Sequence, residues 1–161
     1  MHCRIDDDTS DGLLAMYLMA ARQDAEHYTR RALITQTWAL TLDTWPSVIE
    51  LPMPPLQSVS SVTYISGGNT LTMPSAGYRV VSDGVFGRIK PVDGWPDADS
   101  IPNAITVTFV AGYDPARVPD GVRTAILLHV EIMVDRDPNG TPVLERARDA
   151  LLDPYRVLRV S

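Results

Sequence analysis

The sequence predicts an α+β protein, a small bundle of three main helices with an antiparallel β lobe inserted between the first and second helix. Apolar residues recur at helical spacing in three segments, about residues 8–33, 119–136 and 142–152. Between about residues 35 and 113 they instead alternate with polar residues, as in half-buried strands. The length of 161 residues suits one domain, so we expect a single domain over residues 1–161 that ends in a tail at 153–161.

The first predicted helix has one apolar face. The residues on that face are Leu14, Tyr17 or Leu18, Ala21, Ala25, Tyr28 and Ala32. Asp8, Thr9 or Ser10 could each cap the amino end of this helix. Glu26 and Arg30 are four residues apart, in the order that favours an ion pair on the solvent side.

The β lobe begins with alternating Trp38, Leu40 and Leu42. A second strand is expected at 56–65, where the alternation slips between Val59 and Val62 and predicts a bulge. A tight hairpin should follow, because Gly67-Gly68-Asn69 supplies residues that tolerate positive φ. Later segments predict a strand at 78–82, a turn at Asp83-Gly84, a loop at 94–103 and a strand from Ile105 to Tyr113.

A proline-rich segment, with Pro52, Pro54 and Pro55, precedes the second predicted strand. Such a segment could be displayed as a polyproline ligand for an SH3-like domain. It could instead be a rigid corner between strands, because proline cannot donate a hydrogen bond inside a sheet. The apolar flanking residues Ile49 and Leu56 favour the corner.

The helix predicted at about 119–136 is apolar around nearly its whole circumference. Such a helix must be buried on more than one side, either inside the domain or against another subunit. In the last helix, at 142–152, Thr141 and Pro142 suit the cap and the first helical position, and Leu144, Ala147 and Leu151 form a stripe.

The composition is that of an acidic globular protein, with a formal charge of −6 and Lys90 as its single lysine. Such a charge disfavours gripping the phosphates of nucleic acid, and the arginines suit contacts with other proteins. No apolar run approaches the roughly 20 residues that span a bilayer, so we expect no membrane association. Cys3 is the only cysteine, which excludes an intrachain disulfide.

No pattern of catalytic or metal-binding residues is present in the sequence. His2, His27 and His129 are scattered, and His129 lies in an apolar segment where a satisfied or interface histidine is expected. The acidic run Asp6-Asp7-Asp8 lacks the glycine and the distal glutamate of a calcium loop. The sequence therefore predicts no enzyme, no catalytic residue, no metal site and no cofactor.

One alternative function uses the aromatic residues of the β lobe. Trp38, Trp45, Tyr64, Tyr78 and Trp95 could line a sugar site in a small carbohydrate-binding or hydrolytic domain. Packing of these rings within the lobe and its loops is the favoured interpretation.

The order of several segments resembles the head–tail connector (adaptor) family of tailed bacteriophages and gene transfer agents. The resemblance covers about residues 4–158 and is carried by YTRRALITQTWALTLDTWP, IELPMPPLQSVSSVTYI, ITVTFVAGY, VPDGVRTAILLHVEIMV and ALLDPYRVLRV. Members of that family usually have a further helical stretch before the segment that corresponds to Arg4-Ile5-Asp6, so an amino-terminal contact made by the family is in question here.

The resemblance implies a structural virion protein that forms a ring, commonly dodecameric, beneath the portal. Such a ring continues the DNA channel toward the stopper or tail, and DNA passes through its lumen without sequence-specific binding. The implied partners are further copies of the chain, the portal protein, and stopper or tail proteins. The implied location is the virion neck, after assembly in the host cytoplasm. The alternative within this class is a stopper or tail-completion protein one layer lower.

The resemblance also assigns a role to the carboxyl-terminal tail. In the family this segment often reaches the portal or a neighbouring subunit. Here the corresponding residues are Tyr155, Arg156, Val157, Leu158, Arg159 and Val160. Tyr and Arg are favoured interface anchors. A tail that folds back on its own domain is the equally supported alternative.

Overall fold

The computed structural model describes residues 8–82, 86–135 and 139–158. The chain divides into two compact units. Met1–Leu33 and Ala116–Ser161 make the helical unit, and Ile34–Pro115 makes the β unit. The division follows the predicted bundle and the predicted lobe, and the expectation of one domain over the whole chain stays a prediction.

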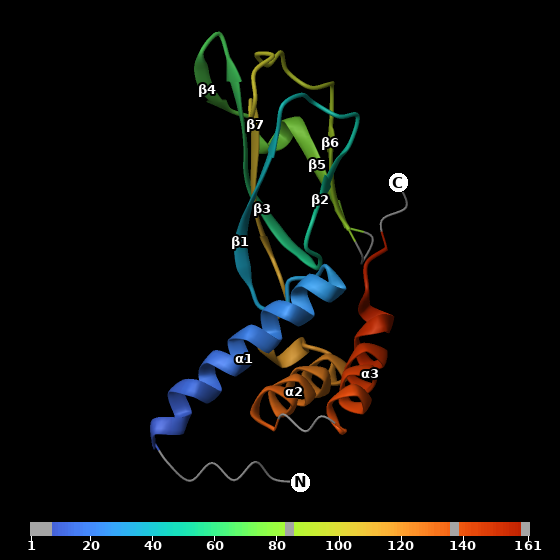
Figure 1. Cartoon of the computed structure of the whole chain (residues 1–161). Helices are drawn as coiled ribbons and strands as arrows, with labels where there is room; N and C mark the ends of the chain where they lie inside the picture. The colour runs from blue at the N-terminus through green and yellow to red at the C-terminus, as the bar shows by residue number, and fades with distance from the viewer. Residues whose placement is uncertain (1–7, 83–85, 136–138, 159–161) are drawn as a thin grey trace. The chain divides into compact units, whose positions relative to one another are not determined.

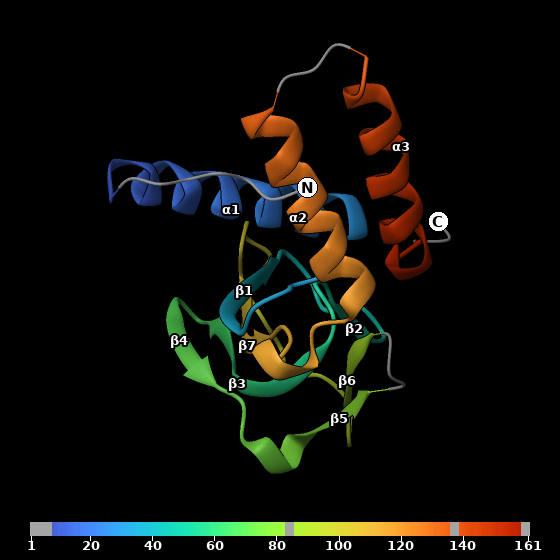
Figure 2. The same ribbon diagram turned by 90° about the horizontal axis from the view of Figure 1, so that it is seen from below.

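The helical unit contains the three predicted helices, α1 (Asp8–Thr29), α2 (Asp120–Val134) and α3 (Thr141–Leu152). A short 3-10 turn, η3 (Asp153–Tyr155), follows α3 directly, and η2 (Pro115–Arg117) precedes α2. Helix α2 packs against both α1 and α3. In Figures 1 and 2 the amino-terminal half of α1 runs beyond the other two helices. The α+β fold class and the three main helices are confirmed.

Helix α1 ends at Thr29, four residues before the predicted end. Arg30 has a φ of 56°, a left-handed conformation that stops the helix. The carboxylate of Glu26 then accepts a hydrogen bond from the backbone N–H of Leu33 at 2.8 Å. The same carboxylate forms an ion pair with Arg22 at 2.8 Å. The predicted Glu26–Arg30 pair is therefore wrong, because the turn at Arg30 takes that residue off the helix and Glu26 is buried.

The predicted cap residues at two helix starts lie inside the helices instead. Helix α1 begins at Asp8, so Thr9 and Ser10 follow within its first turn. In α3 the cap position is Gly140, which leaves Thr141 as the first helical residue and Pro142 in the first turn. Proline is tolerated there, since the first N–H groups of a helix have no partner within the helix.

The β unit contains two antiparallel sheets. The larger has the strand order β1-β7-β3-β4, made of β1 (Gln36–Leu42), β7 (Ile105–Ala111), β3 (Leu56–Ser66) and β4 (Asn69–Thr72). The smaller has the order β2-β6-β5, made of β2 (Ile49–Leu51), β6 (Gly87–Pro91) and β5 (Tyr78–Ser82). A single turn of 3-10 helix, η1 (Ser75–Gly77), leads into β5.

The predicted strand from Ile105 to Tyr113 stops at Ala111. Along β7, residues 105, 107, 109 and 111 are buried and the intervening ones are half-buried, which is the predicted alternation. Gly112 ends the strand with a φ of 123°. A Cβ atom at Gly112 would collide with the backbone carbonyl of Ile34, so this close approach of two chain segments requires glycine.

The predicted bulge and hairpin are both present. Strand β3 shifts register against β7 between Val59 and Ser61. Gly67 and Gly68, with φ of 57° and 75°, connect β3 to β4. The carboxylate of Asp99 accepts hydrogen bonds from both glycine N–H groups, at 2.9 and 2.8 Å. These bonds favour the ionised carboxylate and lower the pKa of Asp99. The turn predicted at Asp83-Gly84 lies outside the described residues.

The proline-rich segment connects the two sheets. Leu51 ends β2 in the smaller sheet, and Leu56 begins β3 in the larger one. Between them the Pro54–Pro55 peptide bond is cis, and the carbonyl of Pro55 accepts a hydrogen bond from Gly112 N–H at 2.9 Å. The segment is thus a corner, as favoured from the sequence, but between the second and third strands, because the short strand β2 was not predicted.

The core of the β unit comes from both sheets. Its fully buried large residues are Phe109, Ile105, Val107, Val62, Ile49, Leu51 and Ile89. On β6, a Cβ atom at Gly87 would strike the side chain of Leu56, so a glycine allows the two sheets to approach there. No helix among the described residues is long and apolar enough to cross a membrane.

Candidate assembly surfaces

The carboxyl-terminal tail is anchored on the end of α1. Tyr28 donates a hydrogen bond from its hydroxyl to Asp153 at 2.7 Å, and Arg31 donates from Nε to the carbonyl of Tyr155 at 2.6 Å. The backbone N–H of Val157 donates to the carbonyl of Thr29 at 2.9 Å. These contacts lie within the helical unit, so the segment up to Val157 is part of its fold.

The six predicted tail residues have different environments. Val157 is 5% exposed, so in this conformation it packs within its own unit and is not presented to a partner. Tyr155 is half-buried, and its ring lies beside Gly121 of α2. Arg156 is exposed, with its guanidinium 5.4 Å from the centre of the Tyr28 ring. Leu158 is 72% exposed. Arg159 and Val160 lie outside the described residues.

The phenol of Tyr28 is perturbed by this anchoring. Because its hydroxyl donates to the carboxylate of Asp153, loss of the proton would break the hydrogen bond and place two negative charges together. The hydrogen bond therefore raises the pKa of Tyr28. Tyr28 stays a neutral donor at neutral pH and holds the beginning of the tail.

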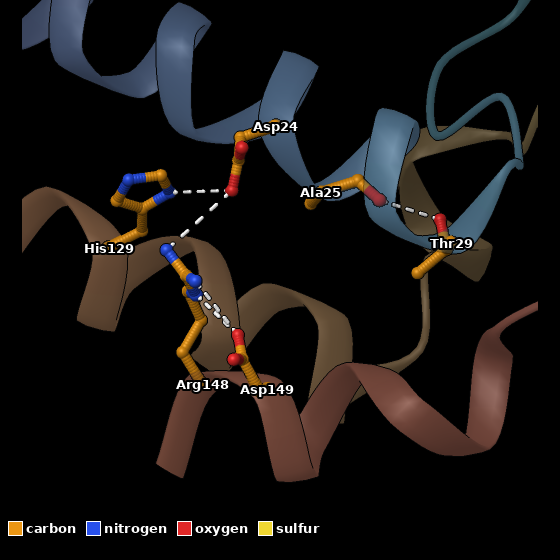
Figure 3. Close-up of polar contacts among 6 residues, drawn as sticks. All are labelled: Asp24, Ala25, Thr29, His129, Arg148 and Asp149. Atoms are coloured by element: carbon orange, nitrogen blue, oxygen red, sulfur yellow. Dashed lines mark hydrogen bonds and ion pairs between the residues drawn. The ribbon is translucent and has the colours of Figure 1, made fainter. Parts of the chain in front are cut away.

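A second set of polar contacts joins all three helices (Figure 3). Asp24 on α1 lies 3.4 Å from Nδ1 of His129 on α2 and 3.6 Å from Nη1 of Arg148 on α3. Arg148 also binds Asp149 at 2.8 Å. The arrangement places one carboxylate between two basic side chains from different helices, so it links the three helices.

His129 is held mainly in its neutral form. Burial lowers its pKa, and the nearby charge of Arg148 lowers it further, while Asp24 opposes the shift. This matches the expectation of a satisfied histidine in an apolar helix. Across the part of the chain that the structure describes, no group of three or more His, Cys, Asp or Glu residues could hold a metal ion.

Two groups of apolar side chains remain exposed on the helical unit. The first, called here the α1 patch, consists of Leu13, Met16 and Met19, which are 50–67% exposed. The second, called here the hairpin patch, consists of Leu127 and Val134 on α2 and Val143 on α3, which are 42–66% exposed. Helix α2 thus buries only Val122, Ala125 and Val130 fully, although it is apolar nearly all round.

The aromatic residues proposed for a sugar site mostly pack on one another. Trp45 stacks on Trp95 with ring centres 4.4 Å apart, and the Tyr64 ring lies 5.9 Å from Trp45. The indole N–H of Trp95 donates to the carbonyl of Pro46 at 2.6 Å. Trp38 is on β1 and Tyr78 on β5.

A cavity of about 350 Å³ adjoins this cluster. It is lined by Tyr64, Met73, Pro74, Gly77, Asp93, Gly94, Trp95 and Pro96. Since Trp45 covers one face of Trp95, and Tyr64 contacts Trp45, the rings act mainly as packing of the β unit, as the favoured interpretation had it.

Comparisons with known proteins identify relatives of this chain. Residues 1–70 match the family model of phage gp6-like head–tail connector proteins. No curated protein matches the chain. The whole chain aligns with a chain in the virion of a native gene transfer agent particle, with a TM-score of 0.79, 24% identity and 84% coverage of that chain.

Two further solved structures have the same fold. One is the neck of an empty gene transfer agent particle computed with C6 symmetry (TM-score 0.77, 24% identity, covering 100% of this chain and 86% of that one). The other is the neck of a native particle computed with C12 symmetry (TM-score 0.73, 24% identity, covering 96% and 87%). The matching family consists of structural connector proteins and not of enzymes. The amino-terminal 70 residues thus resemble head–tail connector proteins, and the whole chain shares its fold with proteins of gene transfer agent particles.

Proposed function

We propose that this protein is a structural head–tail adaptor, a subunit of a ring that lies beneath the portal in the neck of a virion. The observation that carries the proposal is that the whole chain shares its fold with proteins in the neck of gene transfer agent particles. The match of residues 1–70 to connector proteins supports it independently of the fold.

Exposed apolar side chains on the helical unit support the proposal. Its α1 patch and hairpin patch leave six large apolar side chains exposed, and exposed apolar groups of this kind mark surfaces that associate. Assembly by mutual burial of such surfaces requires no cofactor and no catalytic residue. The ring is proposed to be dodecameric, by analogy with the C12 symmetry of the similar neck.

The proposed partners beyond the ring are the portal on one side and stopper or tail proteins on the other. DNA would pass through the lumen without sequence-specific contacts, since a chain with a net charge of −6 holds phosphates poorly. The ring would be assembled in the host cytoplasm and retained in the virion neck.

The end of the tail is the proposed contact with the portal or a neighbouring subunit. Leu158 is exposed directly after the anchored Val157, and Arg156 is exposed beside it. Arg159 and Val160 continue the chain in sequence. Tyr155 and Val157, also predicted as interface residues, would contribute by holding this end in place, because their contacts lie within the helical unit.

Cryo-electron microscopy of particles purified from producing cells tests the proposal. The expected result is a ring of this chain directly below the portal. Density one ring lower would instead identify the stopper or tail-completion alternative. A protein that is absent from purified particles, or present in them only as a monomer, would overturn the proposal.

A further inference from the structure

We propose that neighbouring subunits of the ring are joined by the α1 patch of one copy packing against the hairpin patch of the next. The inference rests on the proposed ring and specifies which surfaces close it. The α1 patch is thus covered by a second copy of this chain, which contacts it with residues of its helices α2 and α3.

Helix α1 is apolar on two faces, but only in its amino-terminal half. Leu14 and Tyr17, on the line of the fully buried Ala21 and Ala25, are half-buried. Leu13 and Met16 are three residues apart on another face and are exposed, with Met19 one turn further along. In the second half of the helix the exposed positions instead carry polar residues such as Gln23 and His27.

The second apolar face coincides with the part of α1 that runs beyond α2 and α3 (Figures 1 and 2). The segment from Leu13 to Ala21 carries no charge. Methionine is flexible and polarizable, and it is enriched where proteins meet. A projecting, uncharged and methionine-rich segment of helix fits a protein surface better than it fits water.

The hairpin patch lies on the pair of helices α2 and α3. Leu127 and Val134 are seven residues apart, so they share one face of α2. Val143 is in the first turn of α3, on the other side of the connection between the two helices. Half-buried Glu131 lies between the two α2 residues on the same face, and exposed Glu145 and Arg146 follow Val143, so charged residues both interrupt and flank the apolar side chains.

A ring needs two different surfaces on every subunit. A two-fold dimer pairs one surface with itself, whereas a closed ring with cyclic symmetry pairs one surface with a different one on the next copy. The helical unit carries two separate exposed apolar groups on different helices, and each copy supplies both. A portal or tail partner would require only one of them, so a second copy accounts for both surfaces at once.

Cysteine cross-linking in purified particles tests this contact. In a Cys3→Ser background, Met16→Cys is combined in turn with Leu127→Cys, Val134→Cys or Val143→Cys, and particles are treated with a short bismaleimide. At least one pair should give a ladder of covalent oligomers on a denaturing gel, extending up to twelve copies if the ring has the C12 symmetry of the similar neck. Each single cysteine variant should give no oligomer.

The controls separate the possible failures. Met16→Cys combined with Leu71→Cys, an exposed leucine on β4, should give no ladder. A dimer from a single cysteine variant would mean a self-paired surface and would overturn the inference. If the chain is present in a ring but none of the three pairs gives a ladder, the inference is wrong while the adaptor function stands. If the particles lack the chain, the proposed function itself fails.

Discussion

Replacing Glu26 by alanine should destabilise the helical unit strongly, although the sequence predicts that Glu26 lies on the solvent-exposed side of its helix. Its carboxylate is buried, and it accepts the N–H of Leu33 at 2.8 Å while pairing with Arg22 at 2.8 Å. Alanine leaves the N–H of the buried Leu33 without this acceptor, which costs about 1–3 kcal/mol. Loss of the partly exposed ion pair adds roughly 0.5–1 kcal/mol.

Glu26→Gln is the matched control, because a glutamine oxygen can still accept the Leu33 N–H. It loses the ion pair with Arg22 but keeps this hydrogen bond, and should cost about 1 kcal/mol or less. Urea unfolding followed by circular dichroism at the helix signal measures both variants. On thermal unfolding, the alanine variant should melt about 5–15 °C lower than the wild type. If glutamine is as damaging as alanine, or if alanine is nearly neutral, the hydrogen bond to Leu33 does not stabilise the end of α1.

Three further predictions concern the tail, a histidine and a glycine. Deleting residues 154–161 removes the anchored Val157 and should lower the free energy of unfolding in urea by about 3 kcal/mol. Deleting residues 158–161 should change that free energy by less than about 0.5 kcal/mol and should instead weaken attachment of the protein to particles. Because the pKa of His129 is lowered in the folded protein, the unfolded chain takes up a proton at this histidine at a higher pH than the folded chain does. The free energy of unfolding should therefore fall as the pH drops below 6.5, and it should fall less steeply in the His129→Gln variant. Parallel pH profiles of stability for the wild type and this variant would refute the prediction. Gly112→Ala should lower the stability measured by thermal unfolding by at least about 3 kcal/mol. Gly68→Ala should cost only about 1 kcal/mol, because Gly68 also has a positive φ but has open space around it. Equal costs of the two substitutions would refute the steric argument.

Regular periodicity allowed much of the fold to be predicted from the sequence. The alternation along Ile105–Ala111 appears as alternating burial in β7, and the glycine pair after β3 forms the expected hairpin. These features depend on residues close in sequence. The short strands β2 and β6 were missed because three to five residues carry too little pattern, and their pairing joins segments that are far apart in the chain.

The tail could not be decided from sequence for a related reason. Its anchors are Tyr28, Thr29 and Arg31, more than 100 residues away, and no local pattern indicates that Asp153 and Val157 will meet them. The end of α1 was misjudged because Ala32 continues the helical spacing, although the chain leaves the helix at Arg30. The second apolar face of α1, with Leu13, Met16 and Met19, was overlooked because only one apolar stripe was considered and these residues lie off it.

The placement of polar and apolar groups separates folding from assembly in the helical unit. Asp24, His129 and Arg148 connect the three helices to one another, while the apolar side chains of the α1 patch and the hairpin patch are exposed. An ordinary monomer places its largest apolar groups inside. Because the two kinds of contact use different residues, substitutions in the patches should abolish the proposed ring and leave the subunit folded. Substitutions among the polar groups should lower the stability of the subunit before they affect association. That separation suits the proposed ring subunit, which would fold alone and bury its exposed apolar side chains only on contact with neighbouring copies.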